Sequence, residues 1–111
     1  MAGTFEVYPD KAGKFRFRLK AGNGQVVAAS EAYESKSGAR EGCGALQRAI
    51  AGAGSCETYE DKAGKFRLRV KSANSQIVAA GQAYESMSGA KEGCAAIKRA
   101  ADGAKIVEVD S

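Results

Sequence analysis

The chain has 111 residues, of which 17 are basic and 13 acidic, and it contains no histidine and no tryptophan. A net charge of +4 is too small to indicate a nucleic-acid-binding protein, and the lack of histidine excludes His-based triads and imidazole metal ligation. Three cysteines without a close pair are not typical of a secreted disulfide framework, so we expect a cytoplasmic protein without cofactor, metal or membrane span.

The chain begins with two predicted strands joined by a turn. Residues 4–8 form the first strand, and residues 9–13 hold the Pro, Asp and Gly that turns favour. Asp10 and Asp61, its counterpart further along the chain, are explained there by hydrogen bonds to the turn backbone. Residues 14–20 alternate perfectly, which predicts a strand with cations on one face and a buried face opposite. The buried positions are Phe15, Phe17 and Leu19.

A hairpin and a third strand follow. Asn23 and Gly24 suit a turn that needs positive φ angles, and it leads into a strand at residues 25–29. The corresponding residues later in the chain, Asn74 and Ser75, match such a turn less well.

The next element is a helix, for which either Ser35 or Ser37 provides a cap. Its apolar residues recur at helical spacing, and the same spacing recurs in a second helix. The two stripes are Ala39, Cys43, Leu46 and Ile50, and Ala90, Cys94, Ile97 and Ala101. Gly42, Gly44 and Gly93 each cost about 1 kcal/mol relative to alanine inside a helix. We expect close approach of the helix to the sheet or to its twin to compensate, the alternative being a weak helix.

The whole pattern is written twice. A shift of 51 positions aligns residues 6–16 with residues 57–67, and about two-thirds of the aligned positions are identical. Residues 105–110 then alternate as a closing strand. The order is therefore βββα, βββα and β. Because residues 106 and 107 fall opposite residues 55 and 56, one central segment can both close repeat one and open repeat two.

Two copies are too few for an open solenoid, and each is too short to hold a core alone. We therefore predict a single α+β domain with pseudo-twofold symmetry, in which both repeats share one mainly antiparallel sheet with two helices on one face. Repeat one spans residues 4–54, repeat two spans residues 55–105, and residues 106–111 form the closing strand.

Two segments resemble the YegP-like family of small bacterial proteins: LKAGNGQVV at residues 19–27 and SEAYESK at residues 30–36. The match covers nearly the whole chain, in both copies. The resemblance implies a tandem-duplicated subfamily in which the C-terminal strands are exchanged between the halves. It supplies a fold and no catalytic or binding residues.

The strongest candidate site is the basic face, defined by the outward cations of the alternating strands. It comprises Lys14, Arg16, Arg18, Lys20, Lys65, Arg67, Arg69 and Lys71. Tyr8 and Tyr59, on neighbouring strands, would add stacking surfaces for single-stranded nucleic acid if they point outward. In the alternative, which we favour, these cations solvate an open sheet face and carboxylates neutralise them across strands. The carboxylates are Glu6, Glu57, Glu108 and Asp110.

The cysteines offer a second candidate. Cys43 and Cys94 occupy equivalent helix positions, so the pseudo-twofold axis could bring them together as a redox pair, provided that their Cα atoms lie within about 7 Å. The alternative is that both are small buried hydrophobes. Cys56, the counterpart of Phe5, is interpreted as strand core.

The sequence thus favours a monomeric, non-enzymatic binding or interaction module that contacts a protein partner through a sheet edge or its surface. The alternative is binding of an anionic polymer or single-stranded nucleic acid through the basic face. A redox-responsive protein is the third hypothesis. Any site built from repeated residues should occur twice, and an asymmetric role should appear where the copies differ. Such pairs include Phe5 with Cys56, Gly24 with Ser75, and Lys36 with Met87.

Overall fold

The computed structural model describes residues 2–109. Its elements follow the predicted order, βββα twice and then a closing strand. They are β1 (Thr4–Pro9), β2 (Phe15–Lys20), β3 (Val26–Ala29), α1 (Lys36–Arg48), the π-helical turn η1 (Ala49–Ala53), β4 (Ser55–Glu60), β5 (Phe66–Lys71), β6 (Ile77–Ala80), α2 (Met87–Ala101) and β7 (Lys105–Glu108).

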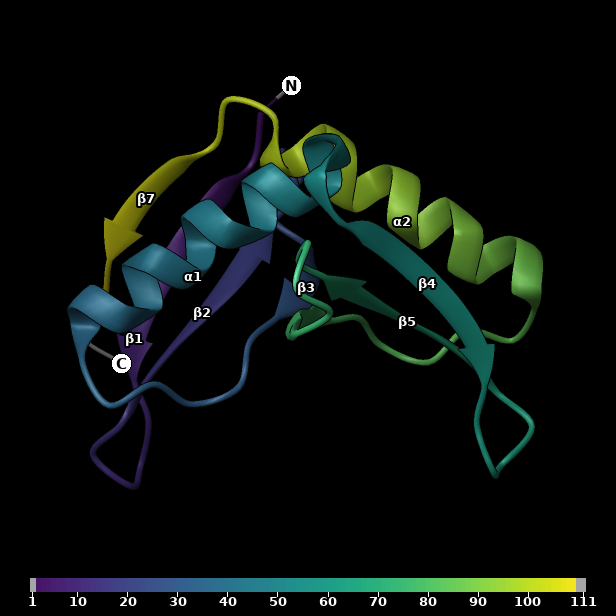
Figure 1. Cartoon of the computed structure of the whole chain (residues 1–111), viewed down its shortest axis with the longest axis horizontal. Helices are drawn as coiled ribbons and strands as arrows, with labels where there is room; N and C mark the ends of the chain where they lie inside the picture. The colour runs from purple at the N-terminus through teal and green to yellow at the C-terminus, as the bar shows by residue number, and fades with distance from the viewer. Residues whose placement is uncertain (1, 110–111) are drawn as a thin grey trace.

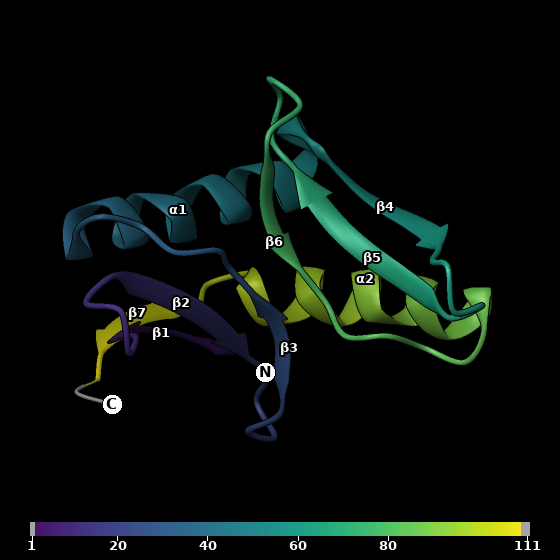
Figure 2. The same ribbon diagram turned by 90° about the horizontal axis from the view of Figure 1, so that it is seen from below.

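The strands form one seven-stranded sheet in the order β4-β5-β6-β3-β2-β1-β7. Neighbouring strands are antiparallel except for β7, which runs parallel to β1. The two halves of the sheet meet where β3 pairs with β6 at Ala29 and Ala80, and the sheet bends sharply there (Figure 2). The fold is therefore α+β with a mainly antiparallel sheet and two helices, as predicted.

Alternation determines which side chains of the strands are buried. Phe17 and Leu19 of β2 are completely buried, and so are Leu68 and Val70, their counterparts in β5. Phe15 lies on the same face but is only partly buried, at the strand end where it pairs with Tyr33. Residues of both repeats contribute to one hydrophobic cluster under the helices, so each repeat completes the core of the other.

The β2–β3 and β5–β6 hairpins form the same turn despite their different sequences. Gly24 has a φ of 85°, and its counterpart Ser75 adopts a φ of 69°. An asparagine side chain supports each turn, because Asn23 accepts a hydrogen bond from the amide of Gln25 and Asn74 accepts one from the amide of Gln76. The poorer turn sequence of the second hairpin therefore does not prevent the hairpin.

Each helix begins at a serine cap and packs closely on the sheet. Ser35 accepts a hydrogen bond from the Gly38 amide at 3.0 Å, and Ser86 caps α2 in the same way, whereas Ser37 lies inside α1. A Cβ on Gly42 would lie 2.4 Å from the Tyr33 hydroxyl and 2.9 Å from Phe17. The expected close approach of helix and sheet is thus confirmed at Gly42 and, through Tyr84, at Gly93. Gly44 has no such neighbour.

The two repeats end differently (Figure 1). After α2 the chain forms β7, which leaves its own repeat and pairs with β1 of repeat one. After α1 and η1 the equivalent residues enter β4, which pairs with β5. The central segment therefore opens repeat two, and the strand exchange implied by the resemblance takes place through β7.

Candidate functional site

The eight cations of the basic face all lie beside carboxylates. The pairs are Lys14–Glu34, Arg16–Asp10, Arg18–Glu6, Lys20–Glu6, Lys65–Glu85, Arg67–Asp61, Arg69–Glu57 and Lys71–Glu57. In the Arg18–Glu6 and Arg67–Asp61 pairs the nitrogen and oxygen atoms lie 2.7 Å apart. Six carboxylates thus oppose eight cations, which leaves two net positive charges on this face.

Hydrogen bonds lower the pKa of several carboxylates on this face. The hydrogen bond from Arg18 lowers the pKa of Glu6, and the hydrogen bond from Arg69 does the same for Glu57. The pKa of Asp10 is lowered chiefly by the backbone amide of Lys14 and next by Arg16. Glu6, Glu57 and Asp10 are therefore held in their charged form, in which they compete with any external anion for the cations.

The tyrosines of the basic face are also engaged. The guanidinium of Arg18 lies 4.6 Å from the centre of the Tyr8 ring, and that of Arg69 lies 4.7 Å from the centre of the Tyr59 ring. Both rings therefore lie on the outer face with the arginines, which hold cation–π contacts with them. A nucleic-acid base would have to displace an arginine to stack on that side of either ring. Binding of an anionic polymer here stays a prediction.

Two of the expected neutralising carboxylates are not part of this face as described. Glu108 pairs instead with Lys36 and Arg40 of α1, because β7 directs this side chain toward the helix layer. Asp110 lies outside the described residues. The sequence interpretation missed Asp10 and Asp61 as ion-pair partners, although a carboxylate in the turn beside an alternating cationic strand was a usable signal.

The hypothetical Cys43–Cys94 redox pair is not formed in the structure, and Cys43 is a buried thiol, as the alternative interpretation expected. Cys94 is bonded to Cys56, with the two Cα atoms 6.0 Å apart. Cys56 does pack against the core from β4, and the sequence interpretation missed only its bond to Cys94. Cys94 faces β4, and the replacement of Phe5 by Cys56 in the second repeat places a sulfur opposite it. Cys43 is a free, fully buried thiol, and burial raises its pKa to about 12. A thiol in that state is inert, which removes Cys43 from any redox pair.

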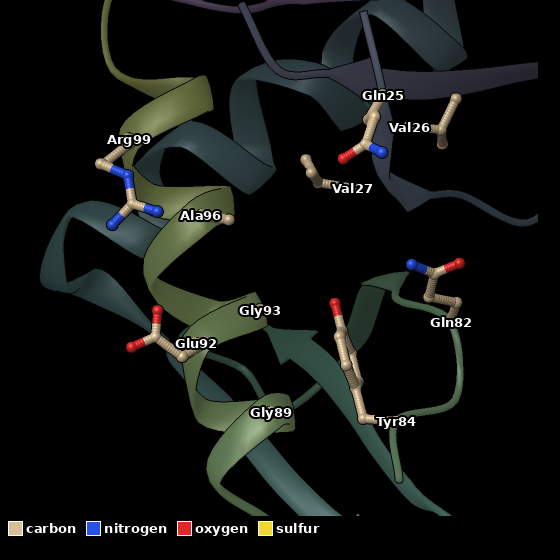
Figure 3. Close-up of a pocket in the computed structure, with 10 residues that line it drawn as sticks. All are labelled: Gln25, Val26, Val27, Gln82, Tyr84, Gly89, Glu92, Gly93, Ala96 and Arg99. Atoms are coloured by element: carbon tan, nitrogen blue, oxygen red, sulfur yellow. The ribbon is translucent and has the colours of Figure 1, made fainter. Parts of the chain in front are cut away.

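An open groove of about 540 Å³ lies between β3 and α2 (Figure 3). Tyr84 directs its hydroxyl into the groove, and the amides of Gln25 and Gln82 lie across the groove from α2. Next to it lies a groove of about 420 Å³ that has Arg99 in its lining. The other half has a matching groove of about 430 Å³ beside the counterpart Arg48. The two smaller grooves thus follow the internal repeat. Within residues 2–109 no three potential metal ligands lie together.

The feature that breaks the symmetry is the outer edge of β4. In repeat one, β7 covers the outer edge of β1 over four residue pairs. In repeat two, β4 pairs with β5 on one side, and no strand of the described chain lies on its other side. The backbone groups along that side are thus open to a partner, and β4 contains neither lysine nor proline, which commonly guard exposed strands.

Burial differs between the two edges in the same way. Phe5 and Val7 of β1 are buried to within 1%, whereas their counterparts Cys56 and Thr58 in β4 are only partly buried. Cys94 is partly buried too, although its counterpart Cys43 is inaccessible. The helix-side surface of β4 is therefore incomplete at the position that β7 fills in the other half.

Comparisons with known proteins agree with this fold. The model of the family described as "Domain of unknown function (DUF1508)" matches twice, at residues 10–55 and 61–108. The chain is 43% identical to the "UPF0339 protein in ptx operon 5'region" of Stutzerimonas stutzeri, covering 98% of both chains. It is 60% identical over 48 residues to a UPF0339 protein of Treponema denticola, covering 43% of this chain and 83% of that protein.

A solved structure is also similar. The solution NMR structure of the protein of unknown function YegP from Escherichia coli superposes with a TM-score of 0.90 at 32% identity, covering all of this chain and 96% of that one. The resemblance seen in the sequence is thereby confirmed. Within the described residues, none of the helices is both long and apolar enough to cross a membrane.

Proposed function

We propose that this chain, which belongs to the DUF1508 family, is a non-enzymatic binding module that captures an extended segment of a partner protein on the free edge of β4. The supporting observation is the contrast between two strands. The outer edge of β1 is covered by β7, whereas the outer edge of β4 has no neighbouring strand in the described chain. Adding a strand to such an edge uses main-chain hydrogen bonds for affinity and side-chain pockets for specificity.

The proposal includes how the chain is organised. Repeat one (4–54), repeat two (55–105) and the closing strand (106–111) act as one domain, and the domain works as a monomer. A cytoplasmic location stays a prediction from the sequence. The Cys56–Cys94 disulfide is of a kind that persists mainly in oxidising compartments, so the redox state of these two cysteines in cells tests the location.

The β4 edge is tested by selection from a library of random peptides of about eight residues. Thr58→Pro is the informative variant, because proline removes an amide that points to the open side and is tolerated at strand edges. Thr58→Val, which restores the residue of repeat one, is the control. We expect peptides that bind the unchanged protein and Thr58→Val but not Thr58→Pro. Peptides that bind all three equally, or an empty selection, would contradict the proposal.

A further inference from the structure

We infer that the captured segment runs parallel to β4 and carries an apolar residue two positions before an acidic one. The apolar side chain packs on the Cys56–Cys94 disulfide, and the acidic side chain reaches Lys91. This inference rests on the proposed function and names the chemistry of its partner.

The template is β7 on β1. Ile106 is in register with Phe5 and is partly buried against the core. Two residues later Glu108, in register with Val7, forms ion pairs with two cations of α1, with its carboxylate 3.1 Å from Arg40 and 3.5 Å from Lys36. An apolar residue and an acid at this spacing therefore lie on the helix side of the strand, since alternate residues share a face.

The internal repeat transfers this template to β4. Under the shift of 51, Cys56 is the counterpart of Phe5 and Lys91 is the counterpart of Arg40. The partly buried Cys56–Cys94 disulfide therefore takes the place that Phe5, the register partner of Ile106, has in repeat one. Lys91 is exposed and forms no ion pair with any other residue among 2–109. Met87 stands in place of Lys36, so the position offers one cation instead of two beside an apolar side chain.

Exchange of the closing strand between copies of the chain cannot fill both β1 and β4 in every chain. Each chain has one closing strand, β7, and two strands that accept one, β1 and β4. Exchange of β7 between copies therefore always leaves one acceptor per chain unfilled. We therefore assign the segment that fills β4 to another protein. A dimer of this chain that pairs two β4 edges, and that Thr58→Pro dissociates, would contradict this assignment.

The backbone of β4 presents the matching hydrogen-bonding groups. In repeat one the carbonyl of Val7 accepts a hydrogen bond from the amide of Val109 at 2.9 Å, on the side of β7. Thr58 occupies the same place in β4, with the same register against β5. Its carbonyl and amide therefore face the open side, because both groups of one strand residue point the same way along the sheet.

The test uses the chain's own closing segment as probe. A fluorescent peptide of residues 102–111 is titrated against the full chain, and anisotropy reports binding. We expect binding that Thr58→Pro abolishes and Thr58→Val retains. An aspartate at the Ile106 position of the peptide should weaken binding at least about tenfold, because the apolar contact is lost. Lys91→Glu should weaken it several-fold, and a peptide with lysine at the Glu108 position should recover this loss.

The paired charge reversal, Lys91→Glu with a peptide that has lysine at the Glu108 position, tests the inference even if Thr58→Pro fails to fold. The inference is overturned if the peptide does not bind. It is also overturned if neither Lys91→Glu nor the peptide with lysine at the Glu108 position changes the affinity. Binding that is unchanged in Thr58→Pro shows displacement of β7 from β1 and overturns it as well. If the library selection yields peptides that depend on Thr58 but lack the apolar–acidic spacing, the partner chemistry is wrong while the proposed strand capture stands.

Discussion

Gly42 and Gly44 lie two residues apart in α1 and have opposite roles. Gly42 lies under the Tyr33 hydroxyl, so an added methyl group has no room there, whereas a Cβ at Gly44 meets only the flexible end of Arg48 at 3.3 Å. Sequence reasoning treated both as costs to be compensated. The fold compensates only one of them.

Alanine substitutions should separate the two glycines. We expect Gly42→Ala to lower the free energy of unfolding by about 1–3 kcal/mol through overpacking. Gly44→Ala should raise it by up to about 1 kcal/mol through helix propensity. Urea titration measures both, and adding Tyr33→Phe should soften the effect of Gly42→Ala. If Gly42→Ala left the free energy of unfolding unchanged, the close packing of helix and sheet would be contradicted.

The ion pairs of Glu6 and Glu57 should make stability depend on pH. Their arginine partners lower the pKa of both carboxylates in the folded state, so folding is favoured above the ordinary value of 4.5 and this contribution is lost as the pH falls through the lowered value. We expect the melting temperature to fall from pH 5 to about pH 3. The double variant Glu6→Gln/Glu57→Gln should show a shallower decline. An equal decline in both proteins would assign the acid sensitivity to other groups.

At the scale of the elements, alternation in residues 14–20 and helical spacing predicted β2, α1 and their copies. The disulfide was not predictable in this way. Periodicity places Cys94 on a helix face and Cys56 on a strand face, but the residues that meet across the two layers depend on the crossing of α2 over β4. The basic face was predicted as a row of cations, yet the turn residues Asp10 and Asp61 became partners only once the turns had folded back beside the strands.

The disulfide holds the edge strand β4 to α2 over a sequence separation of 38 residues. Chain entropy for a loop of this length gives a stabilisation of about 4 kcal/mol. We therefore expect Cys56→Ala/Cys94→Ala to unfold at a clearly lower urea concentration, and reduction of the unchanged protein to have a similar effect. Adding reductant should not change the urea concentration at which the double variant unfolds. A melting curve of the unchanged protein that is insensitive to reductant would show that the bond does not stabilise β4.

The carboxylates of the basic face should limit its affinity for anions. We expect weak binding of single-stranded RNA at about 0.15 M salt, and stronger binding by Glu6→Gln/Glu57→Gln, which frees Arg18, Lys20, Arg69 and Lys71. Titrations at several salt concentrations measure both. Tight, salt-dependent binding by the unchanged protein would favour the nucleic-acid function instead.

At the scale of the whole molecule, the duplication produces near-symmetry with one missing part. Both repeats supply three strands and a helix, but the segment that would close repeat one becomes β4 of repeat two. The sequence predicted that residues 55 and 56 would both close repeat one and open repeat two, whereas in the structure they only open repeat two. It did not show which edge stays open, because edge positions follow from the order of all seven strands and not from any local pattern.

Amide hydrogen exchange tests this central asymmetry most directly. In the free protein, we predict slow exchange at Phe5 and Val7, whose amides face β7, and fast exchange at Cys56 and Thr58, whose amides face the open side. Addition of the peptide of residues 102–111 should slow exchange at Cys56 and Thr58 alone. Slow exchange at those two amides in the free protein, or no change on adding the peptide, would contradict a free β4 edge that accepts a strand.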